Sequence, residues 1–306
     1  MNKKFYFVFI VVILFCAMAF LQGCSDMILF HPKGPIGDSE RYIIFAAFVL
    51  MLVVVIPVII MSIWFPLKYR ATSTKSIYDP KWSHSIKIET VMWLVPLAIV
   101  FLLSILAWRE THRLDPYRPL AAGTEHLNVE VVSLDWKWLF IYPEQHIAVV
   151  NQFTFPANVP LSFRITSDSV MTSFFIPQLG SQIYAMAGMQ TQLHLMANES
   201  GVYAGQNQQF SGRGYPSMNF DSIATSREDF ESWVQKVRQS PEHLDFARLE
   251  ELRKPSVDSP VTYFSSIDPG LFDFIMGKYQ SVPMKHNVSG ETAPPAHENK
   301  GDLEVR

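Results

Sequence analysis

Charged residues are scarce in this sequence. Lysine, arginine, aspartate and glutamate together make up 17% of the 306 residues, against about 25% in an average soluble domain. Acids outnumber bases, and the formal net charge is −3. This balance lacks the basic footprint that nucleic-acid-binding proteins usually carry, so no nucleic-acid partner is expected.

Cysteine is almost absent. The chain holds only Cys16 and Cys24, which excludes a disulfide scaffold and any zinc site built on several thiolates. Hydrophobic residues, by contrast, make up 49% of the chain. Membrane segments are therefore the first feature to look for.

The N-terminus has the layout of a secretory signal. Lys3 and Lys4 precede an uncharged apolar run, Phe5 to Phe20, as in the n-region and h-region of such signals. The run ends at Leu21-Gln22-Gly23-Cys24, which resembles a bacterial lipobox. We predict a signal peptide over residues 1–23 and lipidation of Cys24; the alternative is an uncleaved signal anchor with an unmodified Cys24.

Two longer uncharged stretches follow. Ile43 to Phe65 would form about 34 Å of helix and Thr90 to Trp108 about 28 Å. Each is long enough to cross the hydrocarbon core of a bilayer, which is about 30 Å thick. We predict transmembrane helices over residues 42–65 and 89–109.

The loop between these stretches, residues 66–88, sets the predicted orientation. Its only acid is Asp79, and its bases are Lys68, Arg70, Lys75, Lys81 and Lys87. The positive-inside rule places this loop in the cytoplasm. Residues 24–41 and everything after the second helix then face the periplasm, which agrees with an exported, lipidated N-terminus.

Short strands separated by turns are expected outside the membrane, over residues 125–226. Proline and glycine punctuate the apolar segments of this region, a pattern typical of a β-sandwich or barrel. The expected strands include Leu127 to Val131, Trp136 to Tyr142, Leu161 to Thr166, Thr191 to Met196 and Gly201 to Tyr203. A helical and aromatic-rich segment is predicted over 227–280, with a capped helix start at Ser226. Residues 281–306 are polar and read as a disordered tail.

Three local motifs resemble subunit II of the haem-copper terminal oxidases. They are Glu89 to Pro96 at the entry of the second helix, Asp135-Trp136-Lys137-Trp138, and Ser173 to Leu179. The resemblance covers about residues 42–279. It implies that the chain is a two-helix transmembrane hairpin followed by an all-β, cupredoxin-like sandwich.

The resemblance also implies a dinuclear copper site, but the residues that would bind the metal are missing. The family's two histidines, two bridging cysteines and one glutamate are replaced here, and only its methionine is retained. The positions are Thr172, Asn207, Gln209, Ser211, Tyr215 and the retained Met218. Bridging copper requires soft, anionic sulfur, and neutral amide and hydroxyl groups do not supply it. We therefore expect no metal and no other cofactor in this chain.

A copper-free subunit II behind a lipobox resembles the bo-type quinol oxidase branch. The resemblance implies a bacterial inner-membrane complex that oxidises ubiquinol, reduces oxygen to water and pumps protons. It places the haems and copper in subunit I and makes subunit I, the other oxidase subunits and membrane lipid the partners of this chain. Quinol delivers its electrons within the bilayer, so cytochrome c is not expected as a partner.

No catalytic residue is expected in this chain, but Glu89 is a candidate for proton entry. In the resembling family, the matching glutamate lies at the mouth of a proton channel of subunit I. The alternative is a carboxylate at the membrane interface that only balances Lys87. Two other functions stay open at this point: a membrane-anchored lipoprotein that assists oxidase assembly, and a cytochrome c oxidase subunit II with an altered copper site.

Overall fold

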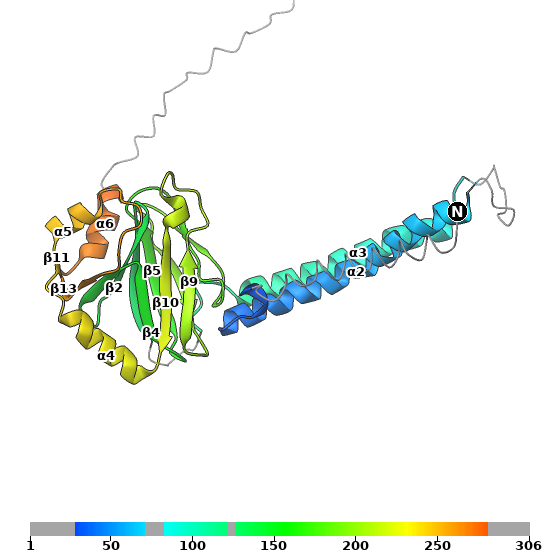
Figure 1. The fold of residues 1–306 in the computed structure, drawn as a ribbon. Helices are drawn as coiled ribbons and strands as arrows, with labels where there is room; N and C mark the ends of the chain where they lie inside the picture. Colours follow the sequence, from blue (N-terminus) through cyan, green and yellow to red (C-terminus); the bar gives the residue numbers. More distant parts are fainter. Residues whose placement is uncertain (1–27, 71–82, 121–125, 281–306) are drawn as a thin grey trace, which may run out of the picture.

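The computed structural model describes residues 28–70, 83–120 and 126–280. Two long helices run side by side and end against a β-sandwich (Figure 1). The helices are α2 (Pro35–Lys68) and α3 (Ile86–Arg113), and a short 3-10 helix, η2 (Ile28–Phe30), precedes them. The predicted order of a helical hairpin followed by an all-β domain is therefore confirmed.

Both helices are longer than the uncharged stretches that predicted them. At 34 and 28 residues they measure about 51 and 42 Å, and each is apolar enough to cross a membrane. They extend beyond the predicted 42–65 and 89–109 because an uncharged run marks only the hydrocarbon core. In the first turns of α2, Asp38 and Arg41 form an ion pair of 3.2 Å without interrupting the helix.

Several predictions fall outside the described residues. The signal peptide over 1–23, the lipidation site at Cys24, residues 71–82 of the predicted cytoplasmic loop and the tail over 281–306 are among them. They stay predictions.

The sandwich is built from two main sheets. The larger has six strands in the order β12-β3-β2-β1-β5-β8, and the smaller has the order β4-β10-β9. The strands of the larger sheet are β1 (Leu127–Leu134), β2 (Lys137–Tyr142), β3 (Ile147–Val150), β5 (Leu161–Ser167), β8 (Thr191–Leu195) and β12 (Thr262–Phe264). Those of the smaller sheet are β4 (Gln152–Pro156), β9 (Gly201–Gln206) and β10 (Asn219–Thr225). Two short pairs join β6 (Thr172–Phe174) to β7 (Ile183–Ala185), and β11 (His243–Leu244) to β13 (Ser266–Ile267).

The six-stranded sheet is covered on both faces. Toward the smaller sheet, aromatic rings fill the core, with Trp138, Phe140 and Phe174 fully buried. The opposite face packs against the C-terminal segment, where α5 (Phe246–Leu252) and α6 (Leu271–Gln280) contribute buried side chains. Burial on both faces explains why all six residues of β2 are buried, since neither side of that strand meets water.

Helix α4 (Arg227–Arg238) connects the sandwich to this C-terminal segment. Its start was predicted from the sequence, and the structure confirms the cap. The Ser226 hydroxyl oxygen accepts a hydrogen bond of 3.1 Å from the Asp229 backbone N–H, which satisfies one of the free donors at a helix start. Phe230, Val234 and Val237 form its buried face.

The start of α2 is hydrogen-bonded to the sandwich. The Lys33 N–H donates to the Gln178 carbonyl at 2.7 Å, and the Gly37 N–H donates to the Leu179 carbonyl at 3.2 Å. A side chain at Gly34 would place its Cβ 2.3 Å from the Met196 carbonyl oxygen, so this close approach requires glycine. The sandwich is thereby fixed to the end of the helical hairpin.

Candidate functional site

The positions that correspond to the family's metal ligands lie on strand β6 and in the loop between β9 and β10. This loop contains the short 3-10 helix η3 (Tyr215–Ser217). Three of the six positions, Asn207, Ser211 and Met218, contact one another. The family resemblance alone related these six positions to one another, and the structure brings Asn207, Ser211 and Met218 into contact.

Asn207 is the centre of this cluster. Its side chain is 5% exposed, and its amide oxygen accepts hydrogen bonds of 2.9 Å from the N–H groups of Ser173 and Gln209. Its amide nitrogen donates to the Ser211 hydroxyl at 3.1 Å and to the Met218 sulfur at 3.4 Å. Buried polar groups are stable only when paired in this way. One neutral side chain therefore connects β6 to both ends of the β9–β10 loop.

The other three positions make their contacts elsewhere. The Thr172 hydroxyl donates to the Ser133 hydroxyl at 2.7 Å. Gln209 reaches the cluster only through its backbone N–H, and the Tyr215 ring packs against Phe210 at a centroid distance of 5.8 Å. The six positions thus do not converge on a common centre.

Trp136 fixes the same loop from the β1–β2 turn. Its indole N–H donates to the Ser211 carbonyl at 2.8 Å. Its ring lies so close to Gly214 that a Cβ there would come within 2.4 Å of the ring. Trp136 itself has a φ of 62°, a conformation that costs energy for a bulky residue. The contacts of Trp136 with Ser211 and Gly214 in the β9–β10 loop account for the conformation of this residue.

These residues do not fit a dicopper centre. The cluster offers an amide, a hydroxyl and one thioether, whereas copper sites of this kind require thiolate and imidazole. The amide nitrogen is a donor and has no lone pair for a cation, and the Met218 sulfur already accepts a hydrogen bond from it. In the part of the chain that the structure describes, no group of three or more His, Cys, Asp or Glu side chains is placed to hold a metal ion.

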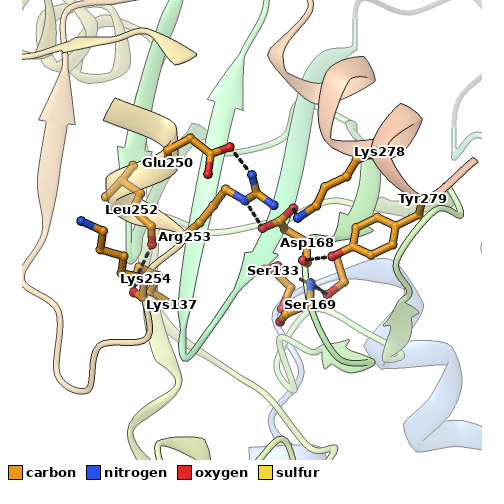
Figure 2. A network of polar contacts seen from close by, with 11 residues as sticks. Ser133, Lys137, Asp168, Ser169, Glu250, Leu252, Arg253, Lys254, Lys278 and Tyr279 are labelled. Carbon is orange, nitrogen blue, oxygen red and sulfur yellow. Dashed lines mark hydrogen bonds and ion pairs between the residues drawn. The ribbon is translucent and has the colours of Figure 1, made fainter. Parts of the chain in front are cut away.

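A second polar cluster, which the sequence did not predict, joins the sandwich to the C-terminal segment (Figure 2). Asp168, just after β5, is 7% exposed, and its carboxylate accepts from the Arg253 guanidinium at 2.5 Å. Lys278 of α6 approaches the other carboxylate oxygen at 3.5 Å. Arg253 also pairs with Glu250, and the Tyr279 hydroxyl donates to the Asp168 carbonyl. Burial raises the pKa of the Asp168 carboxyl, although Arg253 acts in the opposite direction.

Lys137 forms a second connection between the same parts of the chain. The side chain is 2% exposed, and its ammonium group donates to the carbonyls of Leu252 at 2.7 Å and Lys254 at 2.8 Å (Figure 2). Burial lowers the pKa of this amine. The sequence placed Lys137 in a family motif but gave no sign that it holds the end of α5.

Ser133 on β1 contacts both Thr172, one of the replaced ligand positions, and Asp168 of the second cluster. Its hydroxyl accepts from Thr172, and its carbonyl accepts from the Asp168 N–H at 2.9 Å. One residue of β1 therefore connects strand β6, which carries Thr172, to the contacts that hold the C-terminal segment.

Glu89 lies far from both clusters, in the first turn of α3. This end of the hairpin is opposite the sandwich (Figure 1). The side chain is exposed and forms no ion pair or side-chain hydrogen bond with another described residue. Its carboxylate is thus accessible to a partner or to water at the predicted cytoplasmic surface.

Two sequence families match this chain. Residues 127–224 match the family described as Cytochrome C oxidase subunit II, periplasmic domain. Residues 238–281 match the COX Aromatic Rich Motif. The first range coincides with the sandwich from β1 to β10, and the second contains α5 and α6.

Full-length relatives give a closer match. The chain is 53% identical over 283 residues to "Cytochrome bo(3) ubiquinol oxidase subunit 2" of Pseudomonas aeruginosa. The aligned residues make up 92% of this chain and 86% of the relative. It is 48% identical to the protein of the same name from Pseudomonas putida, over 100% of this chain and 94% of the relative. It is 47% identical to "Ubiquinol oxidase subunit 2" of Acetobacter aceti, over 94% and 93% of the two chains.

Proposed function

This chain belongs to the family of subunit 2 of the cytochrome bo-type ubiquinol oxidases, and we propose that it is the copper-free subunit II of a proton-pumping ubiquinol oxidase. The complex oxidises ubiquinol and reduces oxygen to water in the bacterial inner membrane. The observation that carries the absence of copper is the hydrogen-bonded amide of Asn207 at a bridging-ligand position.

The chemistry of the electron donor accounts for the loss of the metal. A soluble donor releases electrons at the outer surface and needs a relay there, whereas quinol is apolar and releases electrons and protons within the bilayer. The haems and copper of the reaction belong to subunit I. This chain then contributes a surface that binds subunit I. Its helices expose apolar side chains along their length, and its sandwich is hydrogen-bonded to the outer end of the hairpin.

Co-purification tests membership of the complex. An affinity tag on this chain is expected to bring down haem-bearing subunit I, together with oxygen uptake that depends on added ubiquinol. A lipoprotein that only assists assembly would be recovered without stoichiometric haem. Recovery of the chain without stoichiometric haem would contradict the proposal.

Met218 is expected to pack in the core without taking part in electron transfer. It is fully buried, and Met218→Leu conserves its volume, so the cost is expected to stay below about 1.5 kcal/mol. Quinol-dependent oxygen uptake and the metal content of the complex are expected to be unchanged. Loss of copper or of activity in an assembled variant would instead mean that the thioether holds a metal.

We propose that Glu89 admits protons to subunit I from the cytoplasm. Its exposed position at the end of the hairpin supports this role, and ionisable groups near membrane depth are often functional. Glu89→Gln is expected to slow quinol oxidase turnover about tenfold. This is less than the roughly 10²–10⁴-fold that a group acting in the chemical step contributes, because Glu89 would act only at the entry of the proton path. Haem content should be normal.

Glu89→Asp is the matched control, since it retains a carboxyl group and is expected to recover most of the turnover. Turnover should be followed as a function of pH, because a group that only stabilises α3 would not alter the pH profile. Full turnover of Glu89→Gln in an assembled complex would exclude the role.

We also propose that Cys24 carries the lipid anchor predicted from the lipobox, with the sandwich on the periplasmic side. The fixed connection between the start of α2 and the sandwich supports this arrangement, because residue 28 then lies at the outer end of the hairpin. Mass spectrometry of the N-terminal tryptic peptide, which ends at Lys33 in the processed chain, would measure the acyl groups directly.

A further inference from the structure

An apolar groove lies where η2, α2 and the sandwich meet. It has a volume of about 400 Å³ and is lined by Ile28–Phe30, by Ile44 of α2, and by Phe175, Pro177 and Gln206 of the sandwich. Figure 1 places η2 and the start of α2, in dark blue, at this junction. The volume is within the range of sites that bind small molecules, which are typically apolar with a few polar groups.

The walls of this groove are suited to an amphipathic ligand. Ile28 and Leu29 are each 47% exposed and Ile44 is 41% exposed, so apolar surface is left uncovered beside the sandwich. Among the described residues that line the groove, only Gln206 is polar, and its side-chain amide makes no hydrogen bond to another described residue. Water would find few partners there, since a stable buried water needs two to four polar contacts.

The sequence supplies an occupant at short range. Cys24 precedes Ile28 by four residues, a distance that spans at most about 14 Å of extended chain. We propose that the groove binds one acyl chain carried by Cys24, with the Gln206 amide facing the ester group of the anchor. This inference rests on the lipidation proposed above.

The position of the groove favours the tethered lipid over a free one. Ile44 lies at the outer end of the uncharged run of α2, so the groove adjoins the predicted membrane boundary, where an acyl chain passes into the bilayer. A chain attached four residues away is present at a high effective concentration. The bound acyl chain then holds η2 against the sandwich and the first turns of α2.

Photo-crosslinking in the intact complex tests this inference. A benzophenone side chain, which reacts with nearby C–H bonds, replaces Phe175 in the groove. A second variant carries it at Ile44, so that the test survives if one variant fails to assemble. The control carries it at Phe246, on α5 and 42% exposed. After irradiation of membranes and trypsin digestion, the lipopeptide from Cys24 to Lys33 is expected to be joined, through an acyl chain, to position 175 or 44 and not to 246.

The possible results distinguish the seating of the acyl chain in the groove from the presence of the lipid anchor on Cys24. Crosslinks from the groove to free phospholipid or to subunit I, with an acylated Cys24, would overturn the seating of the acyl chain and leave the anchor intact. An N-terminal peptide without acyl groups would overturn both the anchor and its seating. Neither result would alter the copper-free role of the sandwich, which depends on other residues.

Discussion

Replacing Asn207 with leucine is expected to destabilise the loop between β9 and β10 by about 3 kcal/mol. The leucine would leave the buried N–H of Ser173 and the partly buried N–H of Gln209 without the acceptor they now share, and an unpaired buried donor costs about 1–3 kcal/mol. Hydrogen exchange of the amides of residues 207–218 should accelerate on the order of 100-fold, since 1.4 kcal/mol corresponds to roughly a factor of ten.

Gln209→Leu is the matched control for this change. It alters a neighbouring position in the same loop, but its side chain takes no part in the Asn207 cluster, so the expected effect is within about 0.5 kcal/mol. Asn207→Asp keeps the acceptor oxygen and should lose less stability than the leucine variant. Equal effects at 207 and 209 would mean that the amide does not hold the loop.

The second large effect is expected from Arg253→Met. Asp168 would stay buried without its principal cation, and removing one partner of a buried ion pair typically costs 3–5 kcal/mol. Because Lys278 remains 3.5 Å from the carboxylate, we expect about 3 kcal/mol, the lower end of that range. Hydrogen exchange of the α6 amides should report the loss, since α6 is held to the sandwich through this cluster.

The pH dependence of this loss follows from Asp168. Its pKa is raised in the folded protein, so the folded state takes up the proton at a higher pH than the unfolded chain. The destabilising cost of the ionised carboxylate is thus present above the folded-state pKa and is lost as the pH falls through it. Without Arg253 the pKa rises further, and the difference between variant and parent should be smaller at mildly acidic pH than at neutral pH.

Arg248→Met is the control for Arg253→Met. Arg248 lies on α5, which Arg253 directly follows, but it pairs with Glu242 and Glu251, whose side chains are 44% and 59% exposed. Surface pairs of this kind contribute about 0–1 kcal/mol. If the two arginine variants lose equal stability, or if the loss from Arg253→Met grows as the pH falls, the buried cluster does not hold the C-terminal segment.

The parts of the fold that depend on local sequence were predictable. Uncharged runs located both long helices, and the pattern of Ser226 and Asp229 located the start of α4. Strands β3 and β4 were not identified, although their regular pairing is clear in the structure. All four residues of β3 are buried, so the alternation that reveals a half-exposed strand is missing from it.

The polar clusters were not predictable, because they join distant parts of the chain. Asp168 and Arg253 are 85 residues apart, and Lys137 reaches carbonyls more than a hundred residues away. The replaced ligand positions could be found only through the family resemblance. The role of Asn207 in holding the β9–β10 loop became clear only from the structure, because an asparagine in a loop can bond to many different backbone groups.

We propose that hydrogen bonds on the neutral amide of Asn207 occupy the place of a metal relay, so that electrons enter the complex from the lipid phase. Metal analysis of this chain after separation from the purified complex, combined with oxygen uptake driven by ubiquinol or by reduced cytochrome c, tests it most directly. We expect no copper bound to this chain and uptake with ubiquinol alone. Stoichiometric copper retained by this chain, or uptake driven by cytochrome c and not by ubiquinol, would contradict the account.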